Sequence, residues 1–127
     1  TGLLLSVFIL CHLGNHLTAL RGATQHIATM QALRLVYRHP LVETALLGAV
    51  LMQLASGWHL FRATRQTAGT FFQQVQRWSG LYLALFFVIH LGAVLGGRLV
   101  LHLDTNFYFG VAGLNTFPVN LFFVPYY

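Results

Sequence analysis

The sequence is poor in charge. Only 7% of its 127 residues are Asp, Glu, Lys or Arg, whereas a soluble domain carries about a quarter. Hydrophobic residues make up 57% of the chain. So few charges cannot cover the surface of a water-soluble globule. The composition therefore excludes an ordinary soluble domain and predicts that a lipid bilayer surrounds most of the molecule.

Acidic residues and lysine are the scarcest charges. Glu43 and Asp104 are the whole acidic set, and all seven strongly basic residues are arginines, which gives a formal net charge of +5. In a soluble protein this excess would suggest a nucleic-acid partner. Here the arginines lie between apolar runs, where contact with lipid headgroups explains them. We therefore expect no nucleic-acid binding.

Cysteine and enzyme motifs are also scarce. The single cysteine, Cys11, lies inside an apolar run, so an internal disulfide is excluded. The sequence has no zinc-ligand spacing, phosphate-binding loop, nucleophile triad or dinucleotide fingerprint. We expect no hydrolytic or nicotinamide-dependent chemistry. The chain starts without methionine and stops inside an apolar stretch, which suggests a fragment of a longer protein.

Three apolar runs are long enough to be transmembrane helices. They cover about residues 1–20, 40–61 and 77–101, and one span takes about 20 residues. Residues 118–127 are expected to be the start of a further helix, and these ten residues are about half the length of one span. The more polar stretch 24–37 has a helical apolar stripe and is expected to lie at the membrane interface.

These elements predict an all-α fold: one transmembrane domain over residues 1–127, built as an integral membrane helical bundle. Its orientation is not predicted, because the arginines divide almost equally between the two sides. One side carries four arginines, which are Arg21, Arg34, Arg38 and Arg98. The other side carries three, which are Arg62, Arg65 and Arg77.

The first and third spans are copies of one another. Residues 1–17 align with residues 79–95, and eight of the 17 positions are identical. The identical positions include a His-Leu-Gly triplet that begins at His12 in one copy and at His90 in the other. With one span between them, the copies cross the membrane in the same direction. The two histidines are therefore expected at the same depth.

Two imidazoles at one depth in neighbouring membrane helices predict a functional site. Ligation of a haem iron by His12 and His90 would explain them, and Gly14 and Gly92 would leave space for the macrocycle. Alternatively, each histidine hydrogen-bonds to a neighbouring helix and stabilises the bundle. Spacing alone leaves both interpretations open.

Three motifs resemble a known family. The run CHLGNHLTALRG (11–22) is similar to the first helix of the membrane-anchor cytochrome b subunits of succinate dehydrogenases and fumarate reductases, of the single-chain two-haem type. The run QRWSGLYLALFFVIHLG (76–92) resembles that family's fourth helix, and AGLNTFPVNLFF (112–123) resembles the loop entering the fifth. The third helix would then be missing, which leaves a four-helix core.

The resemblance implies one haem b, with His12 and His90 at the positions of the family's axial ligands. It also implies electron transfer between quinone and soluble flavin and iron–sulfur subunits. A second haem is not predicted, because Gln53 occupies the ligand position of the second helix and the other ligand position lies beyond Tyr127. His59, beside Trp58 near the membrane surface, is expected to be an interfacial residue, and the alternative is a ligand of a different haem site.

Further polar residues flank these spans. His16 follows His12 by one helical turn, and with Arg21 and Arg98 it is a candidate for contact with a haem propionate or a quinone. Lipid headgroup contact is the alternative.

The third span begins with a second polar group. Gln76, Arg77 and Ser79 either lie near quinone or a partner subunit, or act only as helix-terminal and headgroup residues. Three histidines are expected to be solvated loop residues without a role: His26, His39 and His102.

The function predicted from the sequence is that of a non-catalytic, electron-carrying anchor in the bacterial inner membrane. The alternative is a haem-free, multi-pass membrane scaffold with structural histidines.

Overall fold

The computed structural model describes residues 1–67 and 69–126 and contains helices but no strand within them. The predicted all-α fold is confirmed. The elements, in chain order, are α1 (Gly2–Leu17), the short 3₁₀ helix η1 (Thr18–Arg21), α2 (Ala23–Tyr37), α3 (Pro40–Thr64), α4 (Phe71–Leu99), α5 (Phe107–Asn115) and α6 (Asn120–Tyr126).

Within the described residues, three helical segments are long and apolar enough to cross a membrane. They are α1 together with η1, α3 and α4, with 20, 25 and 29 residues. At 1.5 Å per residue their lengths are about 30, 38 and 44 Å, against a hydrocarbon core of about 30 Å. The three expected spans are thus present as helices of sufficient length. The last helix, α6, has seven residues.

The long helix α4 begins at Phe71, earlier than the expected start near residue 77. Its first turn is closed by a reciprocal capping box. The backbone N–H of Gln73 donates to the Thr70 hydroxyl at 3.4 Å, and the backbone N–H of Thr70 donates to the Gln73 side chain at 2.9 Å. These bonds satisfy backbone donors that would otherwise lack partners, so the helix extends into the polar stretch before the apolar run.

A short helix, α5, forms between α4 and α6. The Asn106 side chain caps it by accepting from the backbone N–H groups of Tyr108 and Phe109, at 2.9 and 3.4 Å. Phe109 also packs directly on Gly97 of α4, where an added Cβ would come within 2.8 Å of the ring. A glycine in α4 therefore allows α5 to approach closely.

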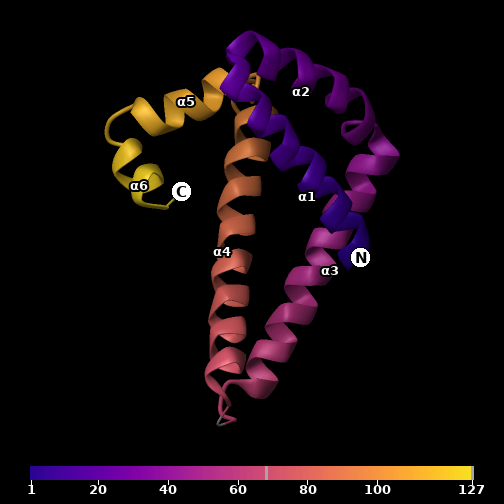
Figure 1. Ribbon diagram of the computed structural model, residues 1–127, viewed down its shortest axis with the longest axis vertical. Helices are drawn as coiled ribbons and strands as arrows, with labels where there is room; N and C mark the ends of the chain where they lie inside the picture. Colours follow the sequence, from indigo (N-terminus) through magenta and orange to yellow (C-terminus); the bar gives the residue numbers. More distant parts are fainter. Residues whose placement is uncertain (68, 127) are drawn as a thin grey trace.

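The helices form an open arrangement around α3 and α4 (Figure 1). α3 and α4 are joined by a short loop and diverge from it. α1 lies against the half of α3 that is remote from this loop, and α2 connects the end of α1 to the start of α3 (Figure 1). Leu5, Ala49 and Val50 form a small buried cluster, against which Leu91 of α4 packs. This cluster is where α1, α3 and α4 meet.

The inward face of α2 is more polar than the sequence suggested. His26, Met30 and Arg34 are buried and lie one helical turn apart, whereas Leu35 and Val36 are exposed. The prediction that His26 is a solvated loop residue is wrong, since it lies within α2 and is only 3% exposed. Its burial follows from helical spacing, which places it on the same face as Met30.

Candidate functional site: a row of histidines

The sequence repeat is reproduced in side-chain packing. In each copy a phenylalanine one helical turn earlier stacks on the histidine. The ring centroids of Phe8 and His12 are 5.6 Å apart with an interplanar angle of 18°, and those of Phe86 and His90 are 5.4 Å apart at 10°. Both imidazoles therefore have the same aromatic neighbour in the same geometry.

The structure brings His12 of α1 and His90 of α4 together. Their ring centroids are 6.0 Å apart and the rings are inclined at 74°. No Cα atom of α1 lies within 8 Å of a Cα atom of α4. The two half-buried imidazoles therefore face one another across helices whose backbones remain apart.

Two further histidines extend this pair into a row. The Nε2 atoms of His16 and His12 lie 3.2 Å apart, so one ring donates a hydrogen bond to the other. The rings of His16 and His26 stack with centroids 5.4 Å apart. Nδ1 of His26 donates to the carbonyl oxygen of Asn15 at 2.9 Å. We call His90, His12, His16 and His26, in this spatial order, the histidine row.

The first two members are of the right chemistry to hold a haem. Imidazole nitrogens are usual ligands of a haem iron, so His12 and His90 would be the two side chains that hold it. They come from two different helices, and their ring centroids are 6.0 Å apart. An added Cβ at Gly14 or Gly92 would meet nothing within 4 Å. Neither glycine is therefore packed against another segment, and each lies two residues from its histidine, on a different side of the helix.

The hydrogen bond within the row sets one condition on ligation. Nε2 of His12 is directed at Nε2 of His16. The same nitrogen cannot hold this bond and bind iron, so ligation through it requires that His16 be released. Among residues 1–67 and 69–126, no group of three or more His, Cys, Asp or Glu side chains is arranged to hold a metal ion. A porphyrin-held iron needs only two protein ligands.

The two arginines named as propionate or quinone contacts lie in different settings. Arg98 forms an ion pair with Glu43, and the side chains are 24% and 26% exposed. This pair links α4 to the first turn of α3. Arg21 ends η1 and is exposed. The positive charge of Arg98 is therefore already matched by a carboxylate, whereas Arg21 is open to the surroundings.

The remaining histidines and Gln53 lie outside the row. Gln53 and His59 are exposed on α3, and His39 and His102 are exposed near helix ends. The structure thus brings together four of the seven histidines, of which His26 was not expected from the sequence. The available signal in the sequence was the four-residue spacing of His26 and Met30, which places both on one face of a helix.

The polar residues at the start of the third span make local contacts. The Ser79 hydroxyl donates to the carbonyl oxygen of Gln76 at 3.1 Å. The Arg77 guanidinium donates to the carbonyl oxygen of Thr67 at 3.4 Å. These bonds stabilise the loop end of α4 and do not reach the histidine row.

No protein-family model, curated protein or solved structure matches the chain. The resemblance to cytochrome b anchors therefore rests on the three sequence motifs alone.

Proposed function

We propose that this chain is an integral membrane, cytochrome b-like anchor that holds one haem b between His12 and His90. It would carry electrons between quinone and a soluble partner containing flavin and iron–sulfur centres. The observation that carries the proposal is the 6.0 Å approach of two imidazoles from repeated helices without close backbone contact.

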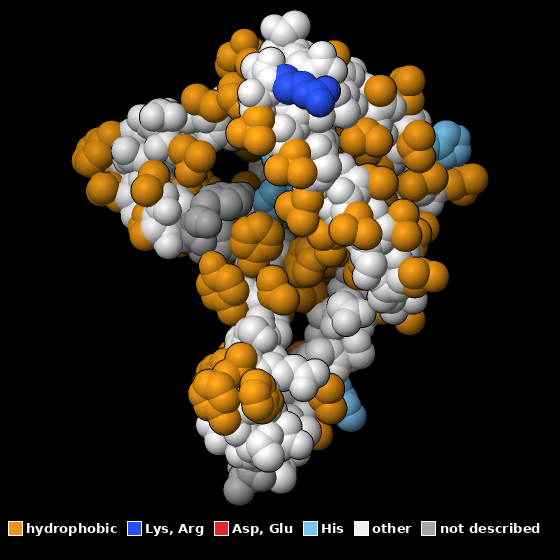
Figure 2. All heavy atoms as spheres, in the orientation of Figure 1, with side chains coloured by type: hydrophobic (Ala, Val, Ile, Leu, Met, Phe, Trp, Pro, Cys, Tyr) orange, Lys and Arg blue, Asp and Glu red, His pale blue; other side chains and the backbone are white. Residues whose placement is uncertain are grey.

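The exposed surface supports membrane insertion. Hydrophobic side chains are spread over much of the face in view, with backbone and other side chains between them (Figure 2). Leu3, Leu10 and Leu51 are 81%, 71% and 68% exposed, although each lies in a long helix. Water-soluble monomers rarely expose contiguous apolar patches of this extent. A lipid environment, proposed here as the bacterial inner membrane, would solvate these side chains.

Each residue of the site has a defined task in this proposal. His12 and His90 would be the axial ligands, and the stacked Phe8 and Phe86 fix the orientation of their rings. The haem, when bound, supplies a reversible one-electron carrier. His16 and the exposed Arg21 are the side chains available to a propionate or to quinone. Dehydrogenase chemistry would belong to the partner subunits, so the chain itself is not assigned catalytic residues.

An absorbance spectrum of the purified full-length protein tests the proposal. We expect reduced-minus-oxidised bands of a low-spin haem b, with one haem per chain. The bands should be lost in His90→Ala and retained in His102→Ala, which removes an exposed histidine outside the row. A folded, colourless protein after expression with sufficient haem would contradict the proposal.

A second candidate function is a haem-free membrane scaffold. One observation favours it: His12 hydrogen-bonds to His16, and His26 to the Asn15 carbonyl, without any cofactor. Such bonds between helices can be purely structural in a membrane bundle. The same spectrum separates the two candidates, because a scaffold would fold without absorbing in the visible range.

A further inference from the structure

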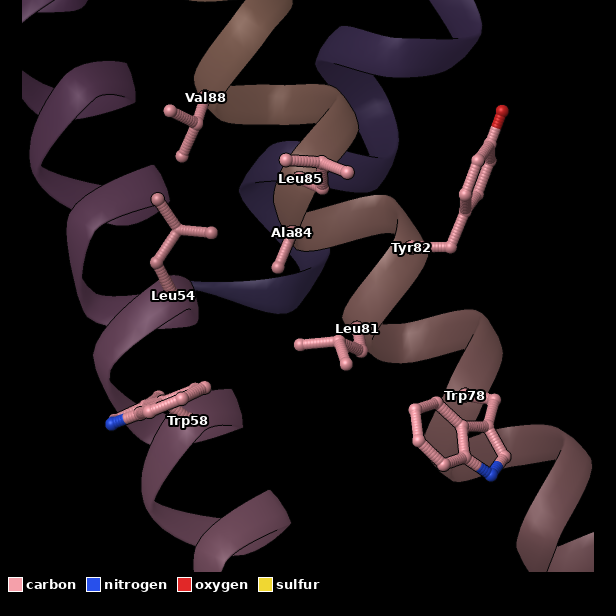
Figure 3. A pocket seen from close by; sticks show the side chains of 8 residues that line it. All are labelled: Leu54, Trp58, Trp78, Leu81, Tyr82, Ala84, Leu85 and Val88. Atoms are coloured by element: carbon pink, nitrogen blue, oxygen red, sulfur yellow. The ribbon is translucent and has the colours of Figure 1, made fainter. Parts of the chain in front are cut away.

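A concave feature lies between α3 and α4, and its α4 residues end at Val88, two positions before His90. It is an apolar groove of about 620 Å³. Leu54 of α3 and Leu81 of α4 extend into the space between the two helices, and Trp58 and Trp78 lie toward the same end of it (Figure 3). The groove is lined by Leu54, Trp58, Trp78, Leu81, Tyr82, Ala84, Leu85 and Val88.

The groove continues along the helices. A second cavity of about 330 Å³ shares Leu54 and Val88 with it and extends to Leu91 and Leu95. From Trp78 to Leu95 is 17 residues, or about 25 Å of helix. This is comparable to one leaflet of the bilayer with its headgroups, which is roughly half of 40–45 Å. The feature therefore has the length and polarity to hold an acyl chain.

The end of the groove marked by the two tryptophans leads to arginines. Arg62 follows Trp58 by one helical turn on α3, and Arg65 caps the same helix. On α4, Arg77 directly precedes Trp78 and lies one turn before Leu81. Residues one turn apart share a helix face. Tryptophan is enriched at the headgroup level of membranes, with arginine commonly beyond it.

This end of the molecule has no acidic side chain to neutralise its arginines. The chain contains only two acidic residues, Glu43 and Asp104, which pair with Arg98 and Arg34. Glu43 lies 19 residues before Arg62 in the same helix, about 28 Å away. Among the residues placed by the structure, neither Arg62 nor Arg65 forms an ion pair. The local charge is therefore uncompensated.

We propose that this groove binds an anionic phospholipid, with an acyl chain between α3 and α4 and the phosphate at Arg62, Arg65 and Arg77. The complementarity of charge selects an anionic over a zwitterionic headgroup. Membrane-embedded proteins use such basic ends of helix pairs to recognise anionic lipids. The proposal depends on membrane insertion but not on haem binding.

Tryptophan fluorescence provides a direct test, because the chain has only two tryptophans and both line the groove. The full-length protein would be reconstituted with increasing fractions of phosphatidylglycerol carrying brominated acyl chains, or of phosphatidylcholine with the same chains. Bromine quenches tryptophan on contact. We expect half-maximal quenching at a lower fraction of the anionic lipid, by about fivefold for each arginine that contacts the phosphate.

Two variants with matched chemistry make the test specific. The double substitution Arg62→Gln, Arg65→Gln should bring the two quenching curves together. The control is Arg21→Gln, which removes an exposed arginine at the end of η1 and should leave the preference intact. Coincident curves in the unaltered protein would overturn the proposal. A preference for the anionic lipid that survives the double substitution would also overturn it, as would an equal loss of that preference in Arg21→Gln. Absence of quenching by either lipid would overturn it too, because it would mean that protein covers the groove.

Discussion

Arg34 and Asp104 form an ion pair across 70 residues of sequence, with 2.7 Å between Nη1 and Oδ1. Arg34 lies in α2 and is 7% exposed, whereas Asp104 lies in the loop after α4 and is 51% exposed. Beside it, the Arg38 guanidinium donates to the Thr105 hydroxyl at 3.2 Å. Together these bonds fix α2 to the α4–α5 loop at the end of the molecule that holds the histidine row.

Asp104→Asn should therefore destabilise the fold. The buried Arg34 would lose its anionic partner, and we expect a decrease of about 1–3 kcal/mol in the free energy of unfolding. This lies between the values for exposed and fully buried pairs, because Asp104 is half exposed. Denaturation of the purified protein by SDS, followed by circular dichroism, gives the change. His102→Ala in the same loop is the control, and equal stability of the two variants would contradict the structure.

The same pair predicts an acid-dependent loss of stability. Desolvation alone would raise the pKa of Asp104, but the hydrogen bond and charge of Arg34, with smaller effects of Asn106 and Arg38, outweigh it and lower the pKa below its ordinary value. A carboxylate with a lowered pKa stabilises the fold fully above its unfolded pKa of about 3.9. This stabilisation is lost as the pH falls through the folded pKa.

The measurement is the unfolding midpoint from pH 7 down to the acid range, compared between the unaltered protein and Asp104→Asn. We expect their difference to be constant at neutral pH and to shrink below about pH 4. A difference that stays constant through the acid range would show that the carboxylate of Asp104 is not responsible.

The sequence predicted those parts of the structure that depend on local patterns. Apolar run length gave the three long helices, and the repeat placed His12 and His90 at equivalent positions. Contacts between distant segments could not be predicted in this way. Arg34 was interpreted as a headgroup charge between apolar runs because its partner, Asp104, is remote in sequence. His26 was interpreted as solvated because its acceptor is a backbone carbonyl, that of Asn15. A polar residue is buried where a partner exists, and a single sequence does not show that partner.

His26→Ala tests whether the last member of the row is structural. Its ring is 3% exposed and donates to the Asn15 carbonyl. Removal would leave a cavity and an acceptor without this donor, so we expect a loss of about 2–3 kcal/mol in stability. SDS unfolding measures it, with the exposed His39→Ala expected to change stability by no more than about 0.5 kcal/mol. Equal effects of both substitutions would argue against the observed packing of α2 on α1.

His16→Ala tests whether His16 competes with the iron for His12 or instead orients His12 for iron binding. Because Nε2 of His16 is bonded to Nε2 of His12, its removal frees the nitrogen that would bind iron. We expect His16→Ala to retain haem, whereas His12→Ala loses it. Loss of a true orienting partner would instead weaken metal binding by about 10–100-fold. Titration of the apoprotein with haem, followed by absorbance, decides between them, and weak binding by His16→Ala would contradict the release of His16.

Cys11 allows membrane insertion to be tested with no cofactor. It is the only cysteine, it lies in the middle of α1, and its side chain is exposed in the protein itself. In water an exposed thiol would react with a membrane-impermeant maleimide. Within a bilayer it would lie about 15 Å from either end of the 20-residue span and remain unlabelled until SDS is added. His102→Cys in a Cys11→Ser background is the control, because this loop position should react in sealed membranes from one side. Labelling of Cys11 in intact membranes at the rate of that control would show that α1 does not cross the bilayer.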